Sequence, residues 1–125
     1  GAKRAMPLPV SVPSHCELMR PAAERFAESI AAINWQAPQI PLVQNVSAAV
    51  AADLDTLKRD LLEQLYKPVR WVESVQTLAA NGATELVECG PGKVLAGLNK
   101  RCAEGVSTSN LNTPDAFAAA RAALA

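Results

Sequence analysis

The stretch "ATELVECGPGKVLAGLNKRC", residues 83–102 of this 125-residue chain, decides the expected fold class. Its opening "ATELVEC" is typical of a β-strand, and "GPGK" predicts a tight turn because glycine and proline favour turn geometries. The "VLAGLNKRC" that follows predicts a helix. A strand that turns directly into a helix is the unit from which α/β proteins with parallel sheets are built.

Strands and helices are expected to alternate along most of the remaining chain. Further strands are expected over residues 6–12 and 41–46, and a weaker one over 106–112. Helical stripes of apolar residues lie between them, and an alanine-rich helix is expected to begin at Pro114. The alternation predicts a three-layer α/β sandwich with a mainly parallel sheet, in which ligands bind at the carboxyl ends of the strands.

The start of the first helix has two possible descriptions. Ser14, with Glu17 three residues later, resembles an N-cap with a capping box. Pro21, however, lies too far in for the first turn of a helix that starts at Ser14. Either the helix kinks at Pro21, or a short turn precedes a main helix that starts near Pro21 and ends near Asn34.

Two more helices are expected in the middle of the chain. Asp53 or Asp55 can cap the first of them, whose leucines recur on one face. Pro68 interrupts this pattern, and a new helix is expected to start there. The dipeptide Asn81-Gly82 should end that helix, because glycine readily adopts the left-handed conformation.

The composition excludes several classes of function. Half of the residues are hydrophobic, 19% are charged and the net charge is zero, which indicates a globular protein without a strong electrostatic footprint for nucleic acid or an anionic membrane. No apolar run is long enough for a membrane span. One histidine and no C-x-x-C pair argue against a metal site. The three separated cysteines suggest reduced thiols in a cytoplasmic protein.

His15 is the only histidine, and it follows Pro-Ser where a strand is expected to end and a helix to begin. An imidazole at the carboxyl end of a strand can serve as a general base, because it titrates close to neutral pH. Position alone nevertheless favours a capping or surface histidine without chemistry. The neighbouring Ser14 and Cys16 are better explained as a helix cap and a small buried residue, since adjacent side chains diverge and seldom form a nucleophile–base pair.

The segment "QLYKPVRW", residues 64–71, contains a backbone acceptor without a helical partner. Pro68 has no N–H, so it cannot donate to the carbonyl of Gln64, four residues earlier. The Gln64 carbonyl is therefore available to a distant donor, which the segment itself does not identify. Gln44 and Asn45 end an expected strand at the same sheet edge as His15, where strand-end hydrogen bonding is the simpler interpretation.

The segment "CGPGKV" does not fit a phosphate-binding loop. Such a loop needs glycine at the position of Val87 and serine or threonine at the position of Val94. A tight turn that requires glycine dihedral angles is the simpler interpretation.

Four segments in order, "PLPVSVPSHCELMRPA", "PLVQNV", "EQLYKPVRWVESV" and "ELVECGPGKVLAGLNKR", resemble the C-terminal part of bacterial malonyl-CoA:acyl carrier protein transacylases. The resemblance runs from about Lys3 to Ala120. It implies an α/β-hydrolase-like core with an inserted ferredoxin-like subdomain. It also implies a ping-pong reaction, in which a serine takes the malonyl group from malonyl-CoA and passes it to the phosphopantetheine thiol of acyl carrier protein. No further cofactor is implied.

The resemblance also assigns residues. The family's catalytic histidine falls on His15, and the backbone carbonyl that orients it falls on Gln64. Val10 and Val94 match positions that line the acyl pocket. On this basis residues 1–10 are expected to be the end of the inserted subdomain, which is otherwise largely absent, and residues 11–125 to belong to the acyltransferase core.

The chain departs from the family pattern in two ways. It has no G-x-S-x-G nucleophile segment, and it lacks the segment with the arginine that pairs with the malonyl carboxylate. We therefore expect a fragment of a longer protein, inactive in isolation, that carries the base without the nucleophile. Two alternatives remain. One is the acyltransferase domain of a polyketide or multifunctional synthase. The other is a non-catalytic module that docks acidic acyl carrier protein through the basic residues Lys93, Lys100 and Arg101.

Overall fold

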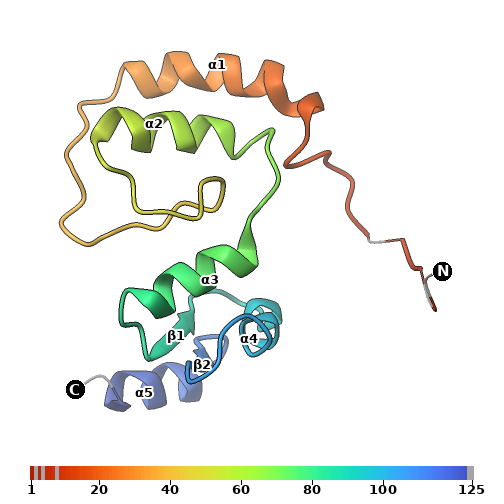
Figure 1. Ribbon diagram of the computed structural model, residues 1–125, viewed down its shortest axis with the longest axis vertical. Coiled ribbons are helices and arrows are strands. Elements are labelled where there is room, and N and C mark those ends of the chain that lie inside the picture. The colour runs from red at the N-terminus through yellow and green to blue at the C-terminus, as the bar shows by residue number, and fades with distance from the viewer. Residues whose placement is uncertain (2, 4, 8, 124–125) are drawn as a thin grey trace.

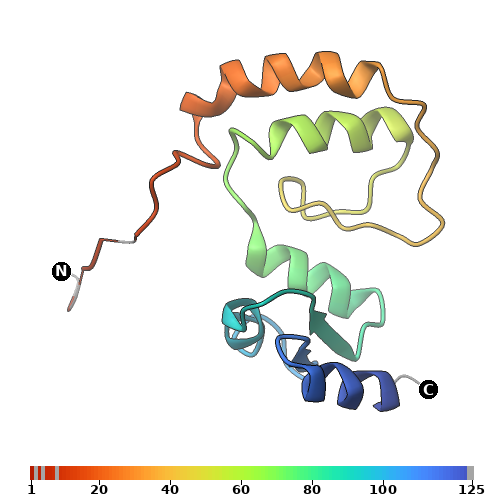
Figure 2. The ribbon, with the colours of Figure 1, turned by 180° about the vertical axis from the view of Figure 1, so that it is seen from behind.

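The computed structural model describes residues 1, 3, 5–7 and 9–123, which form two groups of elements (Figure 1). In the first group, a 3₁₀ turn over Glu17–Met19 leads into helix α1 (Arg20–Ala31), and α1 lies beside helix α2 (Leu54–Glu63). The two helices run in opposite directions, as both views show (Figures 1 and 2). The antiparallel packing places the start of α1 next to the end of α2.

The second group is a small α/β unit. It contains α3 (Trp71–Ala80), β1 (Glu85–Glu88), α4 (Val94–Asn99), β2 (Ser107–Asn110) and α5 (Pro114–Ala123). Strands β1 and β2 pair in parallel, with Glu85 opposite Ser107, and α4 lies on the connection between them. The strand, turn and helix predicted over 83–102 are confirmed, although α4 ends at Asn99. The fold is mixed α/β with a small parallel sheet.

Two expected strands are wrong. The described residues of 6–12 form no strand, and this segment extends away from the helices (Figure 1); Leu8 lies outside the described residues. Pro7 and Pro9 have no N–H to donate to a ladder. Residues 41–46 make only an isolated antiparallel bridge from Val43 to Val50, because the chain turns back on itself between them. With two strands, the described residues do not by themselves build the expected three-layer sandwich.

The boundaries of three helices follow local chemistry. Pro21 lies in the first turn of α1 and a 3₁₀ turn precedes it, so the second description of this helix is correct and Ser14 is not its cap. At α2, Asp53 is the N-cap, and its carboxylate accepts the Thr56 N–H at 2.7 Å. Helix α3 begins at Trp71, later than expected from Pro68. Its end at Asn81-Gly82 is confirmed, with Gly82 at φ +93°.

Few apolar side chains are buried within the described part of the chain. Val75 of α3 is 1% exposed, whereas Leu18 and Ile40 are 75% and 79% exposed. Such a large exposed apolar surface is unusual for a complete monomeric domain. The buried apolar residues are Ala23, Ile30, Ala48, Leu57, Val75, Ala96 and Ala120. No helix among the described residues is both long and apolar enough to span a bilayer.

Candidate functional site

The antiparallel pairing of α1 and α2 brings His15 to the carboxyl end of α2. The Nδ1 atom of His15 lies 2.7 Å from the backbone carbonyl oxygen of Gln64, the C-cap residue of α2. The backbone N–H of His15 donates to the carbonyl of the next residue, Leu65, at 2.9 Å. Two consecutive carbonyls at one helix end therefore hold both the ring and the backbone of His15.

This contact fixes the tautomer of the ring. A carbonyl oxygen can only accept a hydrogen bond, so the hydrogen must be on Nδ1. In the neutral imidazole the lone pair is then on Nε2, which is free to accept a proton from another group. With an exposed side chain and an Nε2 lone pair that the Gln64 contact does not use, His15 is a candidate general base.

The backbone of His15 is strained. Its φ of +61° lies in the left-handed region, which residues with a Cβ seldom occupy. Such a conformation persists where the surroundings impose it, and these positions are frequent at functional sites. The hydrogen bonds to Gln64 and Leu65 supply that constraint.

The residues after His15 are attached to the same helix end. The guanidinium of Arg20 lies 4.1 Å from the ring centroid of Tyr66, a cation–π distance. Arg20 also pairs with Glu17 through hydrogen bonds of 2.7 and 2.9 Å, and this contact lowers the pKa of the Glu17 carboxyl. The segment from His15 to Arg20 therefore contacts three successive residues, 64 to 66.

The other residues singled out in the sequence have structural contacts. Cys16 Sγ donates to the Pro13 carbonyl at 3.1 Å. Gln44 is buried, and its Nε2 donates to the Leu57 carbonyl at 2.8 Å. The Asn45 carbonyl accepts the Arg70 N–H at 2.8 Å, so the 43–50 loop is braced against both α2 and the start of α3.

Val10 and Val94 are not brought together with His15 by any contact of the described residues. Val10 is 68% exposed in the extended N-terminal segment, and Val94 is 71% exposed at the start of α4. Their expected role in an acyl pocket stays a prediction.

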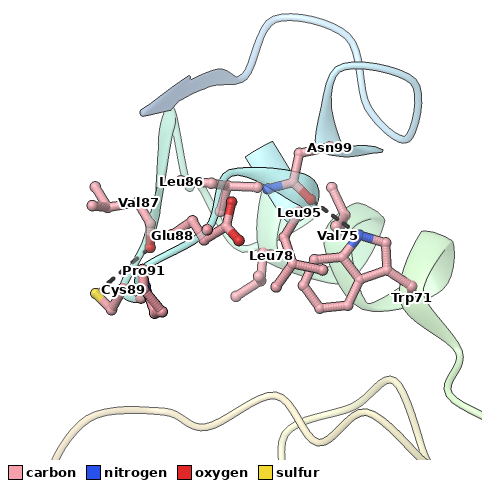
Figure 3. A pocket seen from close by; sticks show the side chains of 12 residues that line it. Trp71, Val75, Leu78, Leu86, Val87, Glu88, Cys89, Pro91, Leu95 and Asn99 are labelled. Atoms are coloured by element: carbon pink, nitrogen blue, oxygen red, sulfur yellow. Dashed lines mark hydrogen bonds between the residues drawn. The ribbon is translucent and has the colours of Figure 1, made fainter. Parts of the chain in front are cut away.

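A pocket of about 310 Å³ lies between α3, β1 and the "GPGK" turn (Figure 3). Trp71, Val75 and Leu95 make its walls largely apolar. At one side Trp71 Nε1 donates to the buried Asn99 Oδ1 at 3.1 Å. The only advance signal was the GPG turn, which predicts close approach of backbone and ligand or strand.

The start of α4 is already occupied by a carboxylate. Glu88 Oε2 accepts the Ala96 N–H at 2.8 Å. A negative charge at this position opposes a bound phosphate, which agrees with the failure of the phosphate-loop motif. Among the described residues, no three His, Cys, Asp or Glu side chains gather into a possible metal site.

A parallel β–α–β unit joined to a histidine held by a helix-end carbonyl defines a mixed α/β protein with a candidate general base. Comparison with known proteins identifies its relatives. Over nearly its whole length, the chain matches a segment that makes up about 39% of the length of bacterial malonyl CoA-acyl carrier protein transacylases. No family model matches the chain.

Three relatives illustrate the match. The malonyl CoA-acyl carrier protein transacylase of Escherichia coli (strain K12) is 52% identical over 120 residues, which cover 96% of this chain and 39% of that protein. The crystal structure of the transacylase from Xanthomonas oryzae pv. oryzae has a TM-score of 0.87 at 50% identity, and covers 93% of this chain and 37% of that one. A malonyl-transacylase in complex with a type II polyketide synthase acyl-carrier protein has a TM-score of 0.89 at 43% identity, and covers 96% and 39%.

The matched segment is less than half of each relative's length. The chain spans about 39% of the length of the curated relatives that it matches. Residues of a site contributed by the other 61% of such a protein therefore lie outside the chain. This is consistent with a histidine that has no nucleophilic serine motif within these 125 residues.

Proposed function

We propose that the chain is the histidine-bearing, C-terminal portion of a transferase that moves a malonyl group from malonyl-CoA to the phosphopantetheine thiol of acyl carrier protein, in fatty acid biosynthesis. The contact of 2.7 Å between His15 Nδ1 and the Gln64 carbonyl supports this function most directly. The resemblance assigns the same two residues to the base and to the group that orients it. The 52% identity to a curated transacylase supports the same activity.

In the proposed reaction His15 acts on a serine contributed by a G-x-S-x-G segment upstream of this chain. His15 Nε2 takes the proton of the serine hydroxyl while the serine oxygen attacks the thioester carbonyl. The bond to sulfur breaks, and the CoA thiolate leaves with the proton that His15 carried. The phosphopantetheine thiol then gives its proton to His15 and attacks the carbonyl of the serine ester. The bond to the serine oxygen breaks, and that oxygen takes the proton back from His15 to restore the serine hydroxyl. The Gln64 carbonyl keeps Nε2 directed at the reacting atoms throughout.

The proposal extends to the architecture and to the acyl pocket. Residues 1–10 would end an inserted ferredoxin-like subdomain, and residues 11–125 would complete an α/β-hydrolase-like three-layer core. Further strands beside β1 and β2 would cover the exposed apolar surface of this chain. Val10 and Val94 would line the acyl pocket once that surface is closed. The free thiols of Cys16, Cys89 and Cys102 suit a reducing cytoplasm.

Acyl carrier protein is the proposed partner. The exposed residues Lys93, Lys100 and Arg101 flank the two ends of α4, where they can face an acidic surface. A structural relative of this chain is in complex with an acyl-carrier protein of a polyketide synthase. That relative also keeps open an origin in polyketide synthesis, and a chain that only docks the carrier is the remaining alternative.

The test uses the chain extended upstream through a G-x-S-x-G segment, here called the extended protein. Intact mass after exposure to malonyl-CoA should show one added malonyl group on the extended protein and none on this chain. His15→Ala should lower malonyl transfer to carrier protein by about 10² to 10⁴-fold, the usual worth of a general base, with carrier binding retained.

Three outcomes would contradict the proposal. Malonyl labelling of this chain alone would mean that Ser14, Cys16 or another local group is the nucleophile. Unchanged transfer in the His15→Ala variant would remove His15 from the mechanism. Retained carrier binding with no transfer, even by the unmodified extended protein, would favour the docking module.

A further inference from the structure

The hydrogen-bond ladder of α2 stops where the His15 ring begins. The Gln64 N–H donates to the Asp60 carbonyl at 3.0 Å, and the Lys67 N–H donates to the Glu63 carbonyl at 2.9 Å. Both bonds join residues four apart. Between them the Leu65 and Tyr66 N–H groups donate only three residues back, to the Leu62 and Glu63 carbonyls at 3.2 and 3.1 Å, so the chain tightens toward a 3₁₀ pattern just beyond α2. The next bond of that ladder would run from the N–H of residue 68 to the carbonyl of Gln64.

Residue 68 is a proline, and it has no N–H to make that bond. The Gln64 carbonyl instead accepts a hydrogen bond from Nδ1 of His15, at 2.7 Å. The following bond of a continued helix would run from Val69 N–H to the Leu65 carbonyl. That carbonyl instead accepts the His15 backbone N–H at 2.9 Å. Both anchors of His15 are therefore acceptors that a continued helix would use for itself.

A local donor would compete strongly for these carbonyls. An N–H four residues along the same chain is held close by the helix, whereas the imidazole comes from a residue 49 positions away. A carbonyl oxygen has two lone pairs and can accept two hydrogen bonds. Each of the two bonds would then be weaker, and the carbonyl group would point more nearly along the helix axis. The hydrogen bond that orients the ring of His15 would be weakened.

We propose that Pro68 is a positioning residue for His15. By withholding an N–H, it reserves the Gln64 carbonyl for the ring, and by ending the ladder it leaves the Leu65 carbonyl for the backbone. The inference rests on the proposed function, because it assigns to Pro68 a part in keeping Nε2 directed at the serine proton. Pro68 itself is exposed and acts only through the helix end.

The first test is Pro68→Ala in the extended protein, which restores an N–H at this position. We expect kcat for malonyl transfer to fall about three- to tenfold, the range of one net hydrogen bond, with KM for malonyl-CoA changed less than twofold. Pro41→Ala, at another exposed proline of the same chain, is the matched control and should leave kcat unchanged.

A second variant distinguishes the effect of restoring the N–H from the effect of removing the pyrrolidine ring. L-Lactic acid at position 68, placed there by translation with the α-hydroxy acid, keeps the alanine methyl group but has an ester oxygen where alanine has an N–H. It should restore kcat to within about twofold of the proline protein, again because one hydrogen bond is involved. The Nδ1–H proton signal of His15 should be present in the proline and lactate proteins and weakened with alanine.

The outcomes distinguish this inference from the function on which it rests. If the alanine and lactate proteins are equally slow, the ring of Pro68 and not its missing N–H matters, and the inference is wrong. It is also wrong if Pro68→Ala and Pro41→Ala are equally active while His15→Ala is inactive. If His15→Ala keeps full transfer, the proposed function itself fails.

Discussion

Replacing Val75 with alanine tests whether α3 is held by the packing seen in the structure. Val75 is 1% exposed and is the largest fully buried side chain among the described residues. It lies in the wall of the pocket beside Trp71 and Leu78, on the side of α3 that faces β1 and α4 (Figure 3). Val72, on the same helix, is 50% exposed.

The size of the effect follows from these exposed fractions. The change removes two methylene equivalents, worth about 1.6 kcal/mol when fully buried. Alanine regains about 0.5 kcal/mol because it is the better helix former. Val75 borders a pocket that is already open, so no separate cavity cost is added, and the net loss is about 1 kcal/mol. For Val72 the burial loss is about half as large, which leaves about 0.3 kcal/mol.

Hydrogen exchange in the extended protein measures this loss locally. Peptides spanning α3 should exchange about fivefold faster in Val75→Ala, and less than twofold faster in Val72→Ala. Equal exchange in the two variants would refute the reasoning, because it would mean that Val75 is not packed as the structure places it. Faster exchange throughout the protein would indicate global destabilisation instead.

Three more predictions concern the site, one cap and the whole chain. Arg20→Met should lower kcat of the extended protein about two- to fivefold by removing the cation–π contact with Tyr66, whereas Arg25→Met, on the exposed side of α1, should not; equal rates would contradict the contact. The cap hydrogen bond from the Thr56 N–H lowers the pKa of the Asp53 carboxyl below its ordinary value of 3.8. The ionised cap therefore stabilises α2 fully above pH 3.8, and this stabilisation is lost as the pH falls through the lower pKa of the folded state. Exchange in α2 measured from pH 6 to pH 2 should show this loss, and Asp53→Asn, which can still cap, should remove the pH dependence. The isolated chain should unfold without a sharp thermal transition in circular dichroism, since the two short strands and exposed apolar side chains of its described residues give little cooperative core; a sharp transition of a monomer would contradict this.

Chemistry that acts over a few residues was predictable. The strand–turn–helix over 83–102, the Asp53 cap and the end of α3 at Gly82 each depend on covalent or near-neighbour preferences. The availability of the Gln64 carbonyl belongs here too, since a proline four residues later lacks an N–H whatever the rest of the chain does.

Pairing between distant segments was not predictable from composition or periodicity. Residues 6–12 and 41–46 have strand-like composition, but a strand forms only when a partner offers its own hydrogen-bonding edge. Within the described residues, Val43 finds only Val50 through a local turn. The resemblance named His15 and Gln64, yet neither residue carries a local signal that points to the other.

The sequence by itself determined that the Gln64 carbonyl has no N–H donor four residues later and that the chain has one imidazole. Only the tertiary structure decided that the two meet. Their contact spans 49 positions, and it exists because α1 and α2 pack in opposite directions, which puts the start of one helix against the end of the other. The left-handed backbone of His15 has the same origin, because its strain is tolerated only where the end of α2 holds both its ring and its N–H.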